Sequence, residues 1–174
     1  MTIPPALTMR PRQDADLPAL LVILRRSHEL YGYPVRASVV RADWLALPTE
    51  LAGAVALHEG RVVGHVALHP AAGPGDDEGE RTAAQRWSAA TGEPRERLAV
   101  VSRLVTDGSV RGAGRALLEH AVRTAAALGR VPVLLVDPDA AARGSYLRHG
   151  WREVGTARQQ WGEHSVDAVL MVPG

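Results

Sequence analysis

The chain of 174 residues contains neither cysteine nor lysine. Without cysteine there can be no disulfide framework, no thiol nucleophile and no thiolate metal site. Without lysine the chain cannot form a P-loop, which needs a lysine after its second glycine to reach the phosphates. The formal net charge of +1 provides no overall attraction to nucleic acids or acidic membranes. These features exclude catalysis by a thiol of the protein and P-loop nucleotide hydrolysis.

Long hydrophobic runs are also missing from the sequence. No apolar stretch reaches membrane-spanning length, and the first residues lack the basic start and apolar core of a signal peptide. The hydrophobic fraction of 46% is ordinary for a globular protein. We therefore expect a cytoplasmic protein with a single domain over residues 1–174 and a loose tail over residues 1–8.

A strand, a turn and a helix are predicted between Leu98 and Leu128. Leu98 to Thr106 is rich in β-branched residues and predicts a largely buried strand. The run from Arg111 to Arg115 then places two glycines and two arginines where an amphipathic helix begins. Free N–H groups at a helix N-terminus bind phosphates well, but an ordinary connection fits the segment too, because a Gly-x-Gly pair is a weak signal. A dinucleotide-binding fingerprint fits poorly because its third glycine is missing.

A second strand and helix follow this segment. Val131 to Val136 predicts another buried strand, which begins near a proline. A helix is predicted over residues 140–149, with Asp139 as its N-cap and Gly150 at its end.

Residues 98–152 resemble the GNAT superfamily of acyl-CoA N-acyltransferases. Arg111 to Ala116 fits the family pattern Arg/Gln-x-x-Gly-x-Gly/Ala, while a second register places Ser109 at the Arg/Gln position. The later segment is similar to Asn-x-x-Ala-x-x-Phe/Leu-Tyr-x-x-x-Gly-Phe/Trp, with Asp139 at the Asn position and Tyr146 at the tyrosine. Because both motifs occur in the family's order and separation, their combination is far more specific than either one.

The resemblance implies an α/β (α+β) GNAT fold. Its central sheet would be mixed but mostly antiparallel, with six to seven strands flanked by about four helices. The remaining sequence patterns predict an edge strand at residues 9–11, a helix capped by Asp14 or Asp16, a hairpin over residues 51–69 with a bulge or close approach at Gly64, and a closing antiparallel pair at residues 152–160 and 166–172.

Residues 70–97 form an insertion between two predicted strands. Pro70 to Glu80 is rich in glycine, proline and acidic residues, which predicts a loop. A short helix is expected around Trp87, from Thr82 to Ala90. The insertion could serve as an acceptor-site lid, as a contact in a homodimer, or as a surface excursion without a role.

The resemblance also implies an activity. It predicts direct transfer of an acetyl group from acetyl-CoA to a primary amine of a small molecule or peptide. Tyr146 would protonate the departing thiolate, and the backbone of Val105 would polarise the thioester carbonyl. A non-catalytic domain that binds acyl-CoA as a sensor or scaffold is the alternative. The residues expected to bind the cofactor are Leu104, Val105, Thr106, Arg111, Gly112, Ala113, Gly114, Arg115, Ala116, Asp139 and Tyr146.

The general base is less evident from the sequence. Glu96, at the start of a predicted strand, is the candidate, and a water relay or an unprotonated acceptor would also serve. No metal site is expected, because His65 and His69 lie four residues apart in a strand, roughly 13 Å, too far to share one ion. Nucleic acid and membrane partners are not expected.

Overall fold

The computed structural model describes residues 6–34, 38, 40–71, 76–161 and 163–174. Seven strands follow the order β1-β2-β3-β4-β5-β7-β6. The chain forms two compact units, of which unit 1 comprises residues 1–68 and 102–124, and unit 2 comprises residues 69–101 and 125–174. Strands β3 and β4 each contribute residues to both units. The elements are β1 (Thr8–Pro11), η1 (Asp14–Asp16), α1 (Leu17–Tyr31), α2 (Ala42–Leu45), β2 (Ala52–His58), β3 (Arg61–Pro70), α3 (Glu78–Thr91), η3 (Arg95–Arg97), β4 (Leu98–Thr106), α4 (Ala113–Ala127), β5 (Val131–Val136), α5 (Ala141–Arg148), β6 (Trp151–Trp161) and β7 (His164–Pro173).

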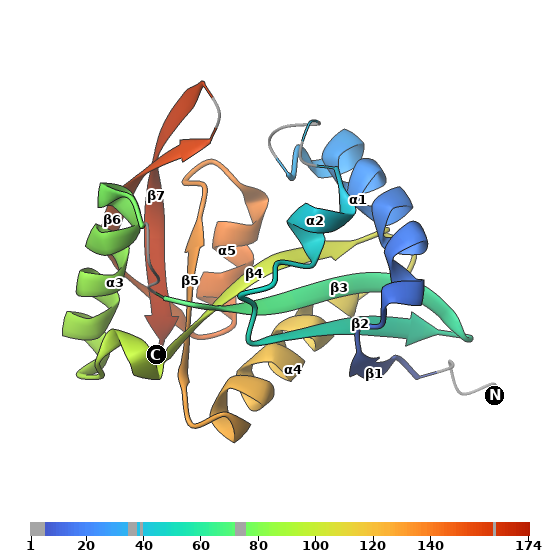
Figure 1. Cartoon of the computed structure of the whole chain (residues 1–174), viewed down its shortest axis with the longest axis horizontal. Helices are drawn as coiled ribbons and strands as arrows, with labels where there is room; N and C mark the ends of the chain where they lie inside the picture. Colours follow the sequence, from blue (N-terminus) through green and yellow to red (C-terminus); the bar gives the residue numbers. More distant parts are fainter. Residues whose placement is uncertain (1–5, 35–37, 39, 72–75, 162) are drawn as a thin grey trace. The chain divides into compact units, whose positions relative to one another are not determined.

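In unit 1, antiparallel strands β1, β2 and β3 lie between α1 and α2 on one face and α4 on the other (Figure 1). The hairpin turns at Glu59 and Gly60, both with positive φ, as a two-residue turn requires. A bulge shifts the register beside Gly64, whose missing side chain leaves room for Leu117 of α4. The bulge and the close approach expected at this glycine are therefore both present. On the opposite face, a hydrophobic core is formed by Leu20, Ile23, Leu24, Leu45, Val55 and Val105.

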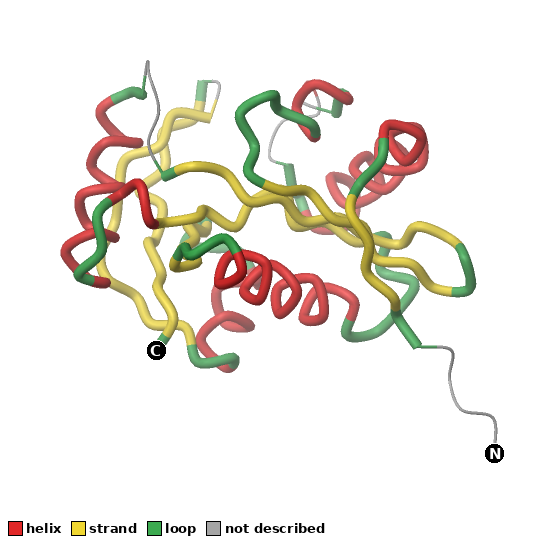
Figure 2. Tube along the Cα trace, turned by 60° about the horizontal axis from the view of Figure 1, so that its bottom comes forward, coloured by secondary structure: helices red, strands yellow, loops and turns green. Residues whose placement is uncertain are grey.

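In unit 2, β4 runs parallel to β5, while β7 pairs antiparallel with both β5 and β6. Helix α3 lies along β6 and β7, and Figure 2 shows it beside these strands. Trp87 of α3 is 2% exposed and packs in a core with Leu98, Val133 and Leu170. The mixed, mostly antiparallel sheet and the predicted fold class are confirmed.

Two predictions about helix starts were wrong. Helix α3 begins at Glu78 rather than Thr82, because the Asp77 carboxylate accepts the N–H of Glu80 and the Glu80 carboxylate accepts the N–H of Asp77. The predicted loop from Pro70 to Glu80 is thus partly helix, while residues 72–75 lie outside the described residues. Helix α5 has Ala140 as its N-cap, without a side-chain cap.

A local turn explains why Ala140, and not the predicted Asp139, is the N-cap of α5. The carboxylate of Asp137 accepts the N–H of Asp139 at 2.8 Å, which forms a turn before the helix. Asp139 therefore belongs to this turn and does not cap α5.

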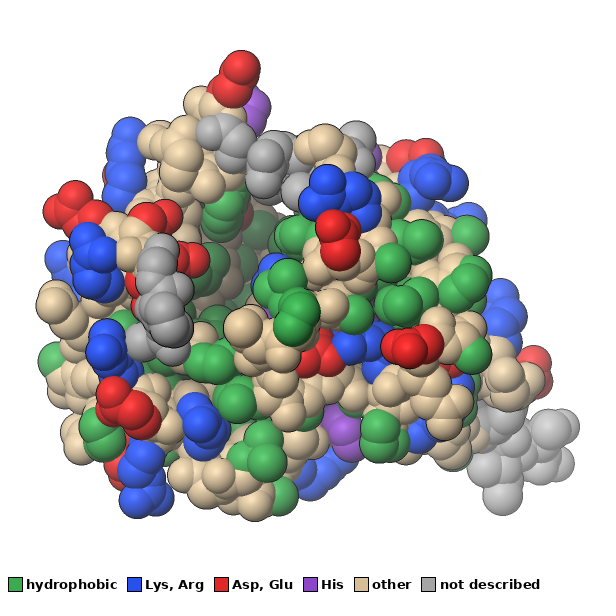
Figure 3. Space-filling view, viewed as in Figure 1, with side chains coloured by type: hydrophobic (Ala, Val, Ile, Leu, Met, Phe, Trp, Pro, Cys, Tyr) green, Lys and Arg blue, Asp and Glu red, His purple; other side chains and the backbone are tan. Residues whose placement is uncertain are grey.

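Insertion helix α3 packs tightly against β6. A Cβ at Gly79 would lie 1.8 Å from the carbonyl oxygen of Arg158, so this contact requires a glycine. Figure 3 shows acidic and basic side chains at the surface over α3, whereas Trp87 of the same helix is buried. Helix α3 therefore contributes to the core of unit 2.

Candidate functional site

Strand β4 has an irregular backbone at Arg103. Its φ is 49°, a left-handed value that is uncommon for any residue with a side chain. The next three residues, Leu104 to Thr106, are those expected to pair with the cofactor. Because unusual backbone conformations persist only where the surrounding structure supports them, this position is a candidate for function.

A buried polar cluster supports the backbone at Arg103. The carbonyl oxygen of Arg103 accepts a hydrogen bond from Nδ1 of His65 at 2.9 Å. His65 is completely buried, and its Nε2 lies 3.0 Å from Nη1 of Arg12. Arg12 also forms an ion pair with Glu50. Sequence reasoning missed this cluster, because its members are distant in the chain and share no motif.

The contacts of His65 determine its protonation. Nδ1 must carry the proton that it donates to a carbonyl oxygen, while Nε2 accepts from the Arg12 guanidinium, so the imidazole is neutral. Burial is the main reason that the pKa of His65 falls to about 4, and the positive charges of Arg12 and Arg103 lower it further.

The side chain of Arg103 extends towards α2. Its Nε donates to the carbonyl oxygen of Trp44 at 3.0 Å, and the guanidinium carbon lies 4.7 Å from the centroid of the Trp44 ring. Tyr33 meets the same indole edge to face, with ring centroids 6.2 Å apart. These three residues form an aromatic-lined arginine cluster in unit 1.

The turn after β4 leads into α4, which begins at Ala113. The N–H groups of Ala113 and Ala116 donate to the carbonyl oxygens of Val110 and Gly112. Within the described residues, the N–H groups of Gly112, Gly114 and Arg115 have no hydrogen-bond partner. Free N–H groups at the start of a helix of 15 residues, together with the helix dipole, favour an anion.

The side chains around this turn differ in their hydrogen bonds and ion pairs. Ser109 donates both its N–H and its hydroxyl to the Asp107 carboxylate. Arg115 forms an ion pair with Glu119 one helical turn later. Arg111 is exposed and forms no ion pair within the part of the chain that the structure describes. Of the three side chains proposed for phosphate contact, Arg111 is the least engaged.

The other predicted site residues lie in unit 2. Tyr146 of α5 is half-buried, and its ring lies 6.3 Å from that of Trp151. Glu96 is exposed in η3, and hydrogen bonds from its own backbone N–H and from Arg95 lower the pKa of its carboxyl. A lowered pKa makes this carboxylate a weaker proton acceptor.

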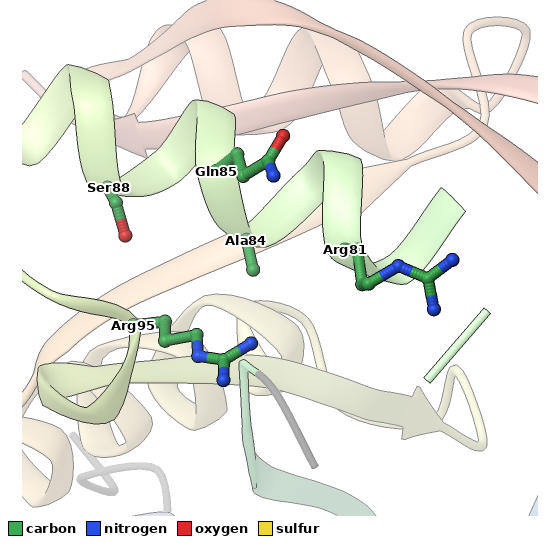
Figure 4. A pocket seen from close by; sticks show the side chains of 5 residues that line it. All are labelled: Arg81, Ala84, Gln85, Ser88 and Arg95. Carbon is green, nitrogen blue, oxygen red and sulfur yellow. The ribbon is translucent and has the colours of Figure 1, made fainter. Parts of the chain in front are cut away.

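Unit 2 also contains a cavity of about 280 Å³ between α3 and η3, shown in Figure 4. Its lining includes Arg81, Gln85 and Arg95, and the guanidinium of Arg95 points beneath α3. Both arginines are already engaged, Arg81 with the carbonyl oxygen of Asp76 and Arg95 with Glu96. Neither the cavity nor its residues belong to the sequence motifs.

The described residues contain no group of three or more histidines or acidic residues that could hold a metal ion. None of the described helices combines the length and hydrophobicity needed to cross a bilayer.

Comparisons with known proteins identify the family to which this fold and the turn before α4 belong. Residues 17–151 match the model of the acetyltransferase (GNAT) family. The chain therefore belongs to the GNAT family of acetyltransferases and is an enzyme of that type. No curated protein sequence was found to match the chain.

Solved structures of several acetyltransferases are similar to the chain. A ribosomal-protein-alanine N-acetyltransferase from Brucella melitensis has 25% identity and a TM-score of 0.63, over 94% of this chain and 97% of the other. The PaiA N-acetyltransferase from Thermoplasma acidophilum, in complex with coenzyme A, has 14% identity and a TM-score of 0.63, over 97% and 98%. YncA from Salmonella typhimurium, with its cofactor acetyl-CoA, has 17% identity and a TM-score of 0.62, over 95% and 92%. The last two similarities show the fold alone.

Proposed function

We propose that this protein transfers an acetyl group from acetyl-CoA to a primary amine of a small molecule or peptide. The amine nitrogen attacks the thioester carbonyl carbon, a C–N bond forms and the C–S bond breaks. Coenzyme A leaves as a thiolate that takes up a proton, and the amine loses one proton as it becomes an amide. No covalent intermediate with the enzyme is involved.

The observation that carries this proposal is the sequence of strand, turn and helix from Leu104 to Ala116. The free N–H groups of Gly112, Gly114 and Arg115 are suited to the pyrophosphate of acetyl-CoA. The exposed guanidinium of Arg111 supplies a positive charge at the same turn. Leu104, Val105 and Thr106 would pair with the pantetheine amides, and the Val105 N–H would stabilise the oxyanion.

The sequence motifs also propose roles for residues of unit 2. Tyr146 would donate the proton that the departing thiolate takes up, since a phenol remains protonated at neutral pH. Asp139 would lie along the cofactor, as in the family motif. Glu96 stays a predicted base, although its lowered pKa makes it a weaker proton acceptor, and a water relay or an acceptor that arrives unprotonated would also serve.

Thiol release from acetyl-CoA with a panel of primary amines tests the proposal. We expect turnover with at least one amine and a decrease in kcat of roughly 10²-fold or more in Tyr146→Phe, because general acids contribute about that much. The affinity for coenzyme A should not change. A Glu96→Gln variant tests whether Glu96 is the general base. Unchanged activity would show that it is not.

One outcome would refute catalysis by this chain. Tight binding of coenzyme A without turnover on any amine would instead indicate a sensor or scaffold that binds acyl-CoA. Calorimetric titration with coenzyme A, performed beside the activity assay, distinguishes these results.

A further inference from the structure

Arg103 lies one residue before the strand segment that would hold the thioester. Consecutive Cα atoms are roughly 3.8 Å apart, so this arginine adjoins the reaction proposed above. Its carbonyl oxygen is held by His65 on one side, and its guanidinium is held by Trp44 on the other. The left-handed backbone and the side chain are therefore positioned together.

The guanidinium of Arg103 retains free donors. Nε donates to the Trp44 carbonyl oxygen, but within the described residues no hydrogen bond from the two terminal nitrogens is found. Glu50 is the acidic residue whose charge acts on Arg103, yet its carboxylate is bound by Arg12. No described carboxylate forms an ion pair with Arg103.

A half-buried charge without an ion pair is stabilised further when an anion pairs with it. Burial lowers the pKa of Arg103, but a guanidinium remains charged at neutral pH. Stacking on Trp44 orients the planar group, and a planar fork with free donors suits a carboxylate in two-pronged geometry.

Tyr33 adds a second donor beside this fork. Burial raises the pKa of its hydroxyl, and the charge and backbone N–H of Arg103 partly oppose that shift. The phenol therefore stays protonated, and its O–H can donate to a bound oxygen. Although its hydroxyl is buried, Tyr33 as a whole is 38% exposed, so the cluster reaches the protein surface.

We propose that Arg103, with Tyr33 and Trp44, binds a carboxylate carried by the acceptor amine, so that the acceptor is an amino acid or a related amino carboxylate. This inference rests on the proposed function. The negative charge of such an acceptor would pair with Arg103 while its amine reaches the thioester beside Leu104.

Activity measurements test this specificity. Matched amino acids and amino acid carboxamides are compared as acceptors by the kcat/KM for thiol release from acetyl-CoA. We expect the acids to be preferred by roughly tenfold to a hundredfold, the effect of a hydrogen-bonded charge. Arg103→Gln should lower kcat/KM for the acids by a similar factor and leave the carboxamides unchanged.

Three variants serve as comparisons. Arg103→Lys keeps the charge without the fork, so it should retain only part of the preference. Tyr33→Phe should reduce the preference by a smaller factor. Arg61→Gln makes the same substitution as Arg103→Gln at an exposed arginine of β3 and should change nothing. If Arg103→Gln lowers the activity for acids and carboxamides equally, with the KM for acetyl-CoA raised, Arg103 is structural and the proposal fails.

A binding experiment separates this inference from the activity itself. The probes are N-acetyl amino acids and their carboxamides, titrated into the protein with coenzyme A present. Tighter binding of the acids, abolished in Arg103→Gln but not in Arg61→Gln, supports the carboxylate site even without turnover. Equal binding of both probes, or binding of neither, overturns it. Circular dichroism establishes that each variant is folded.

Discussion

The Nδ1 atom of His65 lies 2.9 Å from the carbonyl oxygen of Arg103, and this hydrogen bond joins β3 to the irregular position of β4. The bond requires a neutral imidazole that donates from Nδ1, because the guanidinium of Arg12 occupies the other ring nitrogen. A buried histidine thus supports the backbone next to the proposed thioester site. Protonation of this histidine is disfavoured in the folded protein.

This relationship predicts how stability depends on pH. The pKa of His65 is about 4 in the folded protein and 6.5 in its ordinary state. Between these values the unfolded chain binds a proton that the folded chain does not, so the free energy of unfolding falls as pH decreases from about 6.5 to about 4. The loss from His65 should approach about 3 kcal/mol. Urea unfolding at several pH values measures it.

His65→Asn provides the comparison for the pH experiment. Asparagine cannot titrate, but its amide can still donate to the Arg103 carbonyl oxygen. The difference in unfolding free energy between wild type and variant should change by about 3 kcal/mol between pH 6.5 and pH 4, because contributions from all other groups cancel. Parallel pH profiles for the two proteins would contradict the pKa given for His65.

Gly114 is expected to lie against the pyrophosphate of acetyl-CoA. Gly114→Asp places a negative charge beside the free N–H groups, and we expect the dissociation constant for coenzyme A to rise roughly tenfold or more. An acidic residue in the first helical turn should not destabilise α4. Gly114→Ala is the control, because the nearest atom to its new Cβ would be Cγ2 of Thr106 at 4.0 Å. Calorimetric titrations that give equal affinities for both variants would contradict this site.

The arginines of the turn should differ in importance. Arg111→Gln should weaken binding of coenzyme A by roughly tenfold, the value of one charged hydrogen bond. Arg115→Gln should have an effect of about threefold or less, since Arg115 is already paired with Glu119 on the surface. Titrations at two salt concentrations compare them. A larger loss in the Arg115 variant would reverse the assignment.

Gly79 should be essential for the docking of α3. Gly79→Ala brings a Cβ to 1.8 Å from the Arg158 carbonyl oxygen, which forces α3 away from β6. Such overpacking should cost about 1–3 kcal/mol of unfolding free energy. Gly144→Ala in α5 is the matched helical control, where the nearest atom is the flexible Arg148 guanidinium at 3.3 Å. Thermal unfolding should show a lower Tm for the first variant alone, and equal Tm values would argue against the tight contact.

The sequence by itself determined the elements that depend on local patterns. Strand β4 was predicted from Leu98 to Thr106 and β5 from Val131 to Val136, as the structure has them, because runs of β-branched residues bounded by turn formers allow few alternatives. The two motifs around Arg111 and Tyr146 indicated the family, which the comparisons confirmed. The start of α3 is a local signal too, since Asp77 and Glu80 form a capping box, although the glycine, proline and acidic residues of this segment predict a loop.

Only the tertiary structure decided which distant residues meet. The buried polar cluster combines residues from four separate segments, and no spacing rule links them: Arg12, Glu50, His65 and Arg103. The left-handed backbone of Arg103 could not be predicted either, since its own propensity opposes that conformation. Two hydrogen bonds hold Arg103 in place: its carbonyl oxygen accepts from His65, and its Nε donates to Trp44. Both form when β3 and α2 pack against β4. The turn from Arg111 to Ala116 can thus be predicted from the sequence alone. The position of Arg103, which we propose to select the acceptor, depends on tertiary packing.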